Sequence, residues 1–293
     1  MKMTEAIEID YSRFQERLEA AGNARDTTER WALLREFQEE WGYEPTGGAR
    51  WERDEPDAHK EYVAGLASPD AEPEDVDRSL PIPAALDEWW DLPFNSFADR
   101  CELYWTNPVR PPTVRPDPTG YGIADGLPPG NPFVGPDEDP RVCVLMAENQ
   151  YCNEWGYPAA RAHLADPPVL VTVADGEWVL QSRSVSEFFL HLAAARLPAH
   201  YGWTVEDPAL SPEAMTRLRR TLRPMGLLPW RELGSHTEFL GGPDVIACHN
   251  TGYGDTELVV YGRTEEALRR LADTLGTDWS AEITEPESHH EEP

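Results

Sequence analysis

The stretch RVCVLMAENQYCNEWGYP, residues 141 to 158, carries most of the information about the fold. Its first half, RVCVLMAEN, combines β-branched residues with a dense apolar run, which predicts a buried strand. Its second half crowds polar side chains against the rings of Tyr151, Trp155 and Tyr157. Such crowding at the end of a strand is typical either of a binding site or of a turn whose side chains bond their own backbone.

The segments after this stretch alternate strand and helix patterns. Residues 167 to 182, PPVLVTVADGEWVLQS, predict two strands around a turn at Asp175-Gly176. Residues 184 to 198, SVSEFFLHLAAARLP, predict a helix that Ser184 and Glu187 cap and Pro198 ends.

The last ninety residues predict two helices, SPEAMTRLRRTLR and TEEALRRLADTLG, and two strands, DVIACHNTG and TELVVYG.

Upstream, the sequence predicts helices separated by long connections. Residues 10 to 22 and 26 to 42 each place apolar residues on one helical face and end at a glycine. Residues 80 to 92, LPIPAALDEWWDL, predict a short helix, and CELYWT after it a strand. Residues 107 to 140 are rich in Pro and Gly and predict a long loop.

The chain is strongly acidic. Its 54 acidic and 25 basic residues give a formal net charge of -29 over 293 residues. Such a surface repels nucleic acid and anionic membranes and attracts basic partners. No apolar stretch approaches the ~20 residues of a membrane span, and the four cysteines show no metal or disulfide spacing. These features predict a cytoplasmic protein.

The sequence contains no strong catalytic motif. The chain has no GxSxG, no Walker-type GxxxxGK[ST], no HExxH and no GxGxxG. Cys248 and His249 are neighbours in a predicted strand, so their side chains point to opposite faces; a site would need a distant base such as His236 or His163. His289 and His290 could bind a metal weakly, but a solvated acidic tail is the favoured interpretation. We therefore expect no enzyme activity, no catalytic residue, no metal site and no cofactor.

The second half of the opening stretch remains the best candidate for a site. Glu148 and Asn149 could project into a cleft, or they could satisfy the backbone of the following turn while Trp155 and Tyr157 cover it. The second interpretation is favoured, so we expect these two side chains mainly to hold the junction between strand and turn.

The order of these motifs resembles that of the SUKH superfamily, which includes the yeast cell-wall-synthesis regulators. LPIPAALDEWW resembles its Leu-Pro opening, AENQYCNEWGYP its Glu-Asn-Gln segment, and residues 166 to 197 its closing strands and helix. Tyr151 and Cys152 depart from the small residues usual at their positions. The likeness covers roughly residues 79 to 197.

The resemblance implies an α+β fold, with a mixed, mainly antiparallel sheet backed by helices. To this core the chain adds a helical N-terminal lead and an α/β C-terminal extension. The expected parts are a helical lead at 1-42, an acidic Pro/Gly-rich connector at 43-78, a SUKH-like core at 79-204, an extension packed on the core at 205-281, and an acidic disordered tail at 282-293.

The resemblance also implies function. Many bacterial SUKH members look like immunity proteins, which bind and neutralise toxins of the nuclease or deaminase type. The chain is thus expected to bind a basic protein partner and neither nucleic acid nor membrane. Expected contacts are the acidic connector, the long loop and the sheet surface, with the candidate residues Glu148, Asn149, Gln150, Glu154, Trp155 and Trp178.

Two alternatives stay open: a regulatory scaffold of the same fold, and an enzyme with a cryptic cleft site that uses Cys248 or a carboxylate of residues 146 to 158.

Overall fold

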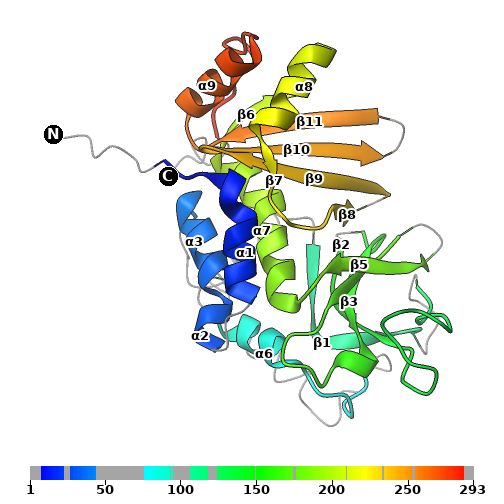
Figure 1. Cartoon of the computed structure of the whole chain (residues 1–293). Helices are drawn as coiled ribbons and strands as arrows, with labels where there is room; N and C mark the ends of the chain where they lie inside the picture. The colour runs from blue at the N-terminus through cyan, green and yellow to red at the C-terminus, as the bar shows by residue number, and fades with distance from the viewer. Residues whose placement is uncertain are drawn as a thin grey trace. The chain divides into compact units, whose positions relative to one another are not determined.

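The computed structural model of the chain contains helices and two antiparallel sheets, which confirms the predicted α+β class (Figure 1). It describes residues 8–22, 27–43, 76–92, 94, 106–117, 124–148, 150–173, 176–208, 210–232, 234–252 and 255–286. None of the described helices combines the length and the apolar composition that crossing a membrane requires.

The chain forms two compact units. Unit 1 contains Met1–Tyr43, Ala193–Trp230 and Ser235–Pro293, and unit 2 contains Glu44–Leu192 and Arg231–Gly234. The N-terminal helices therefore belong to the same unit as the C-terminal sheet. The division falls inside the helix α7 (Val185–Tyr201), so residues 79 to 204 contribute to both units.

Unit 2 is built on a five-stranded meander in the order β1-β2-β3-β4-β5, in which all neighbours are antiparallel. The strands are β1 (Thr106–Arg115), β2 (Val142–Glu148), β3 (Glu154–Pro158), β4 (Val169–Thr172) and β5 (Trp178–Ser182). Helix α6 (Ala84–Asp91), the 3-10 turn η3 (Ala159–Arg161) and the first part of α7 complete the unit.

Both faces of this sheet are covered. On one face, which we call the loop face, Val142, Val144, Leu170 and Trp178 pack against Ala124 and Leu127 of the segment before β2. On the other, the helix face, Trp155 lies 6.2 Å from the ring of Phe188 in α7. Trp89 of α6 stacks on Phe189 of α7 at 3.6 Å. Because β2 lies under both layers, all seven of its residues are buried, which explains its apolar run from Val142 to Ala147.

The predicted loop at 107 to 140 is wrong in its first part, since residues 106 to 115 form β1. Prolines normally argue against a strand because they lack the N–H that a ladder needs. Here Pro108, Pro111 and Pro112 are tolerated because β1 is an edge strand, and its pairing with β2 shifts register between Pro108 and Thr113. Residues 101 to 105, expected to be a strand, lie outside the described part of the chain.

Unit 1 contains a second antiparallel sheet in the order β6-β11-β10-β9-β7. Its strands are β6 (Trp203–Glu206), β7 (Arg223–Pro224), β9 (Ser235–Gly242), β10 (Val245–Gly252) and β11 (Asp255–Gly262). The short β8 (Trp230–Glu232) spans the boundary between the two units in the chain. The predicted strands at β10 and β11 are confirmed. The strands β6 and β9 were missed, because β9 mixes polar residues and glycines and β6 is only four residues long.

Helices pack against this second sheet. The predicted helices are confirmed as α8 (Pro212–Thr221), which Ser211 caps, and α9 (Glu265–Leu275), which Thr264 caps and Gly276 ends in the left-handed conformation. Both share a core with β6, β10 and β11.

The N-terminal elements of unit 1 are η1 (Tyr11–Arg13), α1 (Phe14–Gly22), α2 (Thr27–Arg30) and α3 (Ala32–Glu40). They form an aromatic cluster of Tyr11, Phe14, Phe37 and Trp41, with neighbouring ring centroids 5.8 to 6.3 Å apart. The main chain of Tyr11 lies against Gly241 of β9, where a Cβ would come within 2.4 Å of the Tyr11 carbonyl oxygen.

Gly156 offers a test of the packing in unit 2. A Cβ at this position of β3 would lie 2.5 Å from the carbonyl oxygen of Cys143 and 2.8 Å from a methyl group of Val142. Gly156→Ala should therefore lower the free energy of unfolding by about 1 to 3 kcal/mol, measured by urea denaturation. Gly22→Ala, where nothing lies within 4 Å, is the matched control and should change stability by less than about 0.5 kcal/mol. Equal effects of the two substitutions would contradict the close packing of β3 on β2.

Candidate functional site

Glu148 organises the turn between β2 and β3. Its Oε2 accepts hydrogen bonds from the backbone N–H groups of Gln150, at 2.9 Å, and of Cys152, at 3.2 Å. Its own main chain closes the turn, because its N–H donates to the Asn153 carbonyl and its carbonyl accepts from the Tyr151 N–H, both at 2.8 Å. The prediction that Glu148 holds the strand-to-turn junction is confirmed. Asn149, the other residue of that prediction, lies outside the described residues.

The end of the same turn is fixed to β4. The Asn153 side chain donates to the Thr172 carbonyl oxygen at 2.6 Å, and the Thr172 hydroxyl accepts from the backbone N–H of Glu154 at 2.9 Å. Asn153 and Thr172 are both buried. The turn is therefore held by side chains at both of its ends, and Tyr151, at φ 59°, takes the left-handed conformation between them.

Glu154 forms a buried ion pair with Arg115 of β1. The guanidinium Nε lies 3.0 and 2.9 Å from the two carboxylate oxygens, and a terminal nitrogen lies 2.5 Å from Oε1. The remaining terminal nitrogen donates to the Val114 carbonyl at 3.0 Å. The two side chains are only 9% and 2% exposed, so Glu154 is engaged inside the unit rather than presented to a partner.

The two tryptophans predicted to lie on a binding surface are buried as well. Trp155 belongs to β3 and not to a covering turn, and it is fully enclosed. Trp178 is 3% exposed, and its indole N–H donates to the Asp125 carbonyl at 2.7 Å, which ties the 124 to 140 segment to the loop face. Of the six candidate contact residues, Glu148, Glu154, Trp155 and Trp178 are thus buried, and only Gln150 is described and exposed.

The cysteine and histidine candidates do not assemble into a catalytic pair. Cys248 is buried and His249 is partly exposed, as opposite faces of β10 require. Burial raises the pKa of the Cys248 thiol to about 12, so it stays protonated and is a poor nucleophile. His236 shares a 2.8 Å hydrogen bond with Thr251, and His163 belongs to the other unit.

Within the described ranges, no group of three or more His, Cys, Asp or Glu side chains is arranged to hold a metal ion. His289 and His290 lie outside those ranges.

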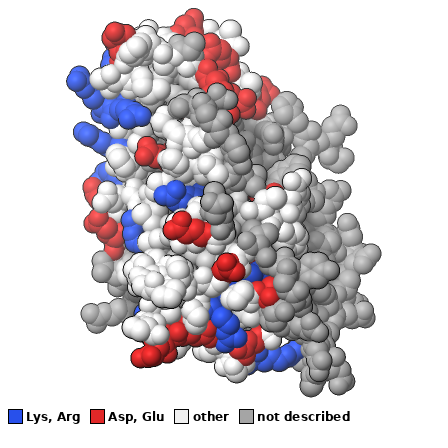
Figure 2. All heavy atoms as spheres, turned by 90° about the vertical axis from the view of Figure 1, so that its right-hand side faces the viewer, with Lys and Arg blue, Asp and Glu red and all other residues white. Residues whose placement is uncertain are grey.

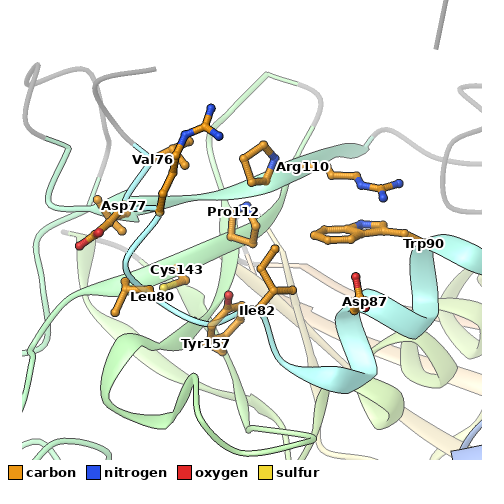
Figure 3. Close-up of a pocket in the computed structure, with 13 residues that line it drawn as sticks. Val76, Asp77, Leu80, Ile82, Asp87, Trp90, Arg110, Pro112, Cys143 and Tyr157 are labelled. Atoms are coloured by element: carbon orange, nitrogen blue, oxygen red, sulfur yellow. The ribbon is translucent and has the colours of Figure 1, made fainter. Parts of the chain in front are cut away.

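A pocket that the sequence did not indicate lies on the helix face of unit 2, with a volume of about 330 Å³ (Figure 3). Its walls are the segment before α6, the helix α6 itself and the edge strand β1. The lining residues are Val76, Asp77, Arg78, Leu80, Ile82, Asp87, Trp90, Arg110, Pro111, Pro112, Val114, Cys143 and Tyr157.

The pocket brings together residues that are far apart in the sequence. Val114, Cys143 and Tyr157 are register partners across β1, β2 and β3, so they form one row along the floor. Trp90 and Asp87 come from α6 and Arg110 from β1 (Figure 3). The one local signal was the apolar face of residues 80 to 92; the Pro-rich sequence of β1 hid the other wall.

No protein-family model, no curated protein and no solved structure matches this chain. The resemblance to the SUKH superfamily therefore stays an expectation.

The role of Glu148 can be tested by substitution. Glu148→Ala removes both side-chain hydrogen bonds of the turn and leaves two N–H groups without their acceptor, which should cost about 1 to 3 kcal/mol in free energy of unfolding. Glu148→Gln keeps an acceptor oxygen and should recover part of this loss. Gln150→Ala, at an exposed position of the same turn, is the control, with less than about 0.5 kcal/mol expected in urea denaturation. If Glu148→Ala unfolds like the control, the carboxylate does not hold the junction.

Proposed function

We propose that this chain is a non-catalytic protein-binding protein that captures a basic protein in the cytoplasm, in the manner of an immunity protein that neutralises a nuclease- or deaminase-type bacterial toxin. The observation that carries the proposal is the formal net charge of -29. A toxin that grips nucleic acid needs a basic face, and an acidic protein is complementary to such a face.

Ion pairs within the chain neutralise much of its positive charge. At least ten arginines pair with carboxylates of the same chain: Arg13, Arg17, Arg35, Arg115, Arg141, Arg161, Arg183, Arg263, Arg269 and Arg270. Several of these pairs lie on the surface, and Figure 2 shows acidic and basic side chains next to each other on one face. Since much of the positive charge is neutralised in this way, the excess carboxylates determine how the surface appears to a partner.

Two regions are the best candidates for the contact. Residues 44 to 75 contain ten acidic and three basic side chains. In the loop-face segment, Asp125 and Asp137 are exposed. The buried Trp155 and Trp178 are not part of the proposed contact, so electrostatic attraction at Asp125 and Asp137 takes the place of an aromatic surface.

The cytoplasmic location is supported by the cysteines. Cys143, Cys152 and Cys248 are free thiols, and free thiols are usual in a reducing compartment. The absence of a catalytic role is supported by the hydrogen bonds and ion pair that engage Glu148 and Glu154 and by the burial of Cys248.

The proposal predicts salt-sensitive binding to the protein encoded beside this chain's gene, provided that protein is basic. Biosensor measurements at about 50 and 500 mM NaCl should show association at least about tenfold slower at high salt, because screening removes the electrostatic attraction. Binding should also inhibit the partner's nuclease or deaminase activity. Capture without inhibition would favour a regulatory scaffold instead.

A charge variant and its control locate the contact. Asp125→Asn with Asp137→Asn should slow association about threefold at low salt while leaving dissociation nearly unchanged, as expected for charges at the rim of an interface. Asp273→Asn with Glu282→Gln, which removes two charges from unit 1, should have a smaller effect. No binding at low salt, or binding that salt does not affect, would contradict the proposed function.

A further inference from the structure

The pocket of unit 2 has an apolar, uncharged floor. Val114, Cys143 and Tyr157 form that floor and are all buried. Burial raises the pKa of the Cys143 thiol to about 12 and also raises the pKa of the Tyr157 phenol, so both groups are neutral at physiological pH. Ile82, Pro111 and Pro112 extend the apolar surface up the walls. A ligand that fills this space must therefore present a largely apolar body.

Two arginines, Arg78 and Arg110, line the pocket, and Arg110 contacts an aromatic ring. The Arg110 guanidinium carbon lies 4.4 Å from the centre of the Trp90 ring, a cation–π contact that holds the side chain in place (Figure 3). Among the described residues, Arg110 has no carboxylate within ion-pair distance, in contrast to at least ten arginines of the same chain. The protein has more than twice as many acidic as basic residues, so most arginines can find a carboxylate partner. An arginine that is held by an aromatic ring and has no carboxylate partner is therefore a favourable binding site for an anion.

The carboxylates that line the pocket do not supply that anion. Asp77 is bound by Arg141 at 2.8 Å and by the Ser79 hydroxyl and N–H, at 2.6 and 2.9 Å. Asp87 lies one helical turn before Trp90 on α6 and is exposed. A negative charge at Asp87 disfavours a second one nearby, so a ligand with a single negative group fits better than a dianion.

We propose that this pocket binds a small organic monocarboxylate with an aromatic or branched apolar body. The carboxylate would pair with the Arg110 guanidinium, and the body would lie on the floor formed by Val114, Cys143 and Tyr157. A volume of about 330 Å³ is at the lower end of the range of ligand pockets, which selects a compact ligand. This inference goes beyond the proposed capture of a protein partner and does not depend on it.

Three probes of similar shape test the charge requirement. Calorimetric titration of the full-length protein with 3-phenylpropionate should show saturable binding. The neutral 3-phenylpropanol and the cationic 3-phenylpropylamine should each bind at least about tenfold more weakly, because they cannot form the ion pair with Arg110. Equal binding of the alcohol, or no saturable binding of the carboxylate up to about 10 mM, would overturn the proposal.

Substitutions test how much the Arg110 guanidinium contributes to ligand affinity. Arg110→Gln should weaken 3-phenylpropionate at least about tenfold and make it bind no better than the alcohol. Arg183→Gln removes the same charge from an exposed position of unit 2 that does not line the pocket, and binding should be unchanged. Unchanged affinity of Arg110→Gln would overturn the assignment of the guanidinium.

A further variant fills the pocket without touching Arg110. Ile82 lines the pocket and is 42% exposed, so Ile82→Trp is tolerated by the fold while its ring occupies the space of the ligand body. It should abolish binding of 3-phenylpropionate with an unchanged circular dichroism spectrum. Full binding by the folded Ile82→Trp protein would show that the ligand lies elsewhere and would overturn the proposal. These assays contain no partner protein, so their failure is distinct from a failure of protein capture.

Discussion

The buried ion pair between Arg115 and Glu154 is the constraint on which the sheet of unit 2 depends. It connects β1 to β3 across the intervening β2, and the two residues are 39 positions apart in the sequence. The edge strand β1 contains three prolines, so it has fewer backbone N–H groups that can form ladder hydrogen bonds. A charged contact at its end compensates for the missing ladder bonds. The pair is tolerable inside the unit because both oxygens of Glu154 and all three nitrogens of Arg115 have partners.

Three polar side chains of residues 146 to 158 have structural roles, and one of them belongs to this ion pair. Glu148 holds the turn, Asn153 fixes it to β4, and Glu154 anchors β1, so each of these polar side chains is engaged by the fold. The aromatic residues Trp155 and Tyr157 belong to the buried β3. By fixing β1 beside β2, the pair also positions Arg110 and Val114 at the pocket. The segment that resembles a site therefore helps to build the pocket, to which it contributes Tyr157.

Local signals were sufficient for part of this structure. The strands β2, β4, β5, β10 and β11 and the helices α6, α8 and α9 follow from apolar patterns and caps that a sequence displays directly. The role of Glu148 was also predictable, because its hydrogen bonds reach only two and four residues along the chain. In contrast, β1 was hidden because proline is usually a strand breaker, and its edge position is a property of the whole sheet. The burial of Glu154 depends on an arginine far away in the sequence, and the pocket depends on three separate segments.

A double-mutant cycle on Arg115 and Glu154 tests the central claim most directly. Glu154→Leu alone leaves the Arg115 charge buried without its partner and should lower the free energy of unfolding by about 3 to 5 kcal/mol. Arg115→Met alone leaves the Glu154 charge buried without its partner and should lower the free energy of unfolding by a similar amount. The double variant replaces the pair by apolar groups and should recover most of that loss, giving a coupling energy above about 2 kcal/mol in urea denaturation. Single substitutions that cost less than about 0.5 kcal/mol, or costs that simply add, would contradict the account, because the ion pair would then not hold the sheet together.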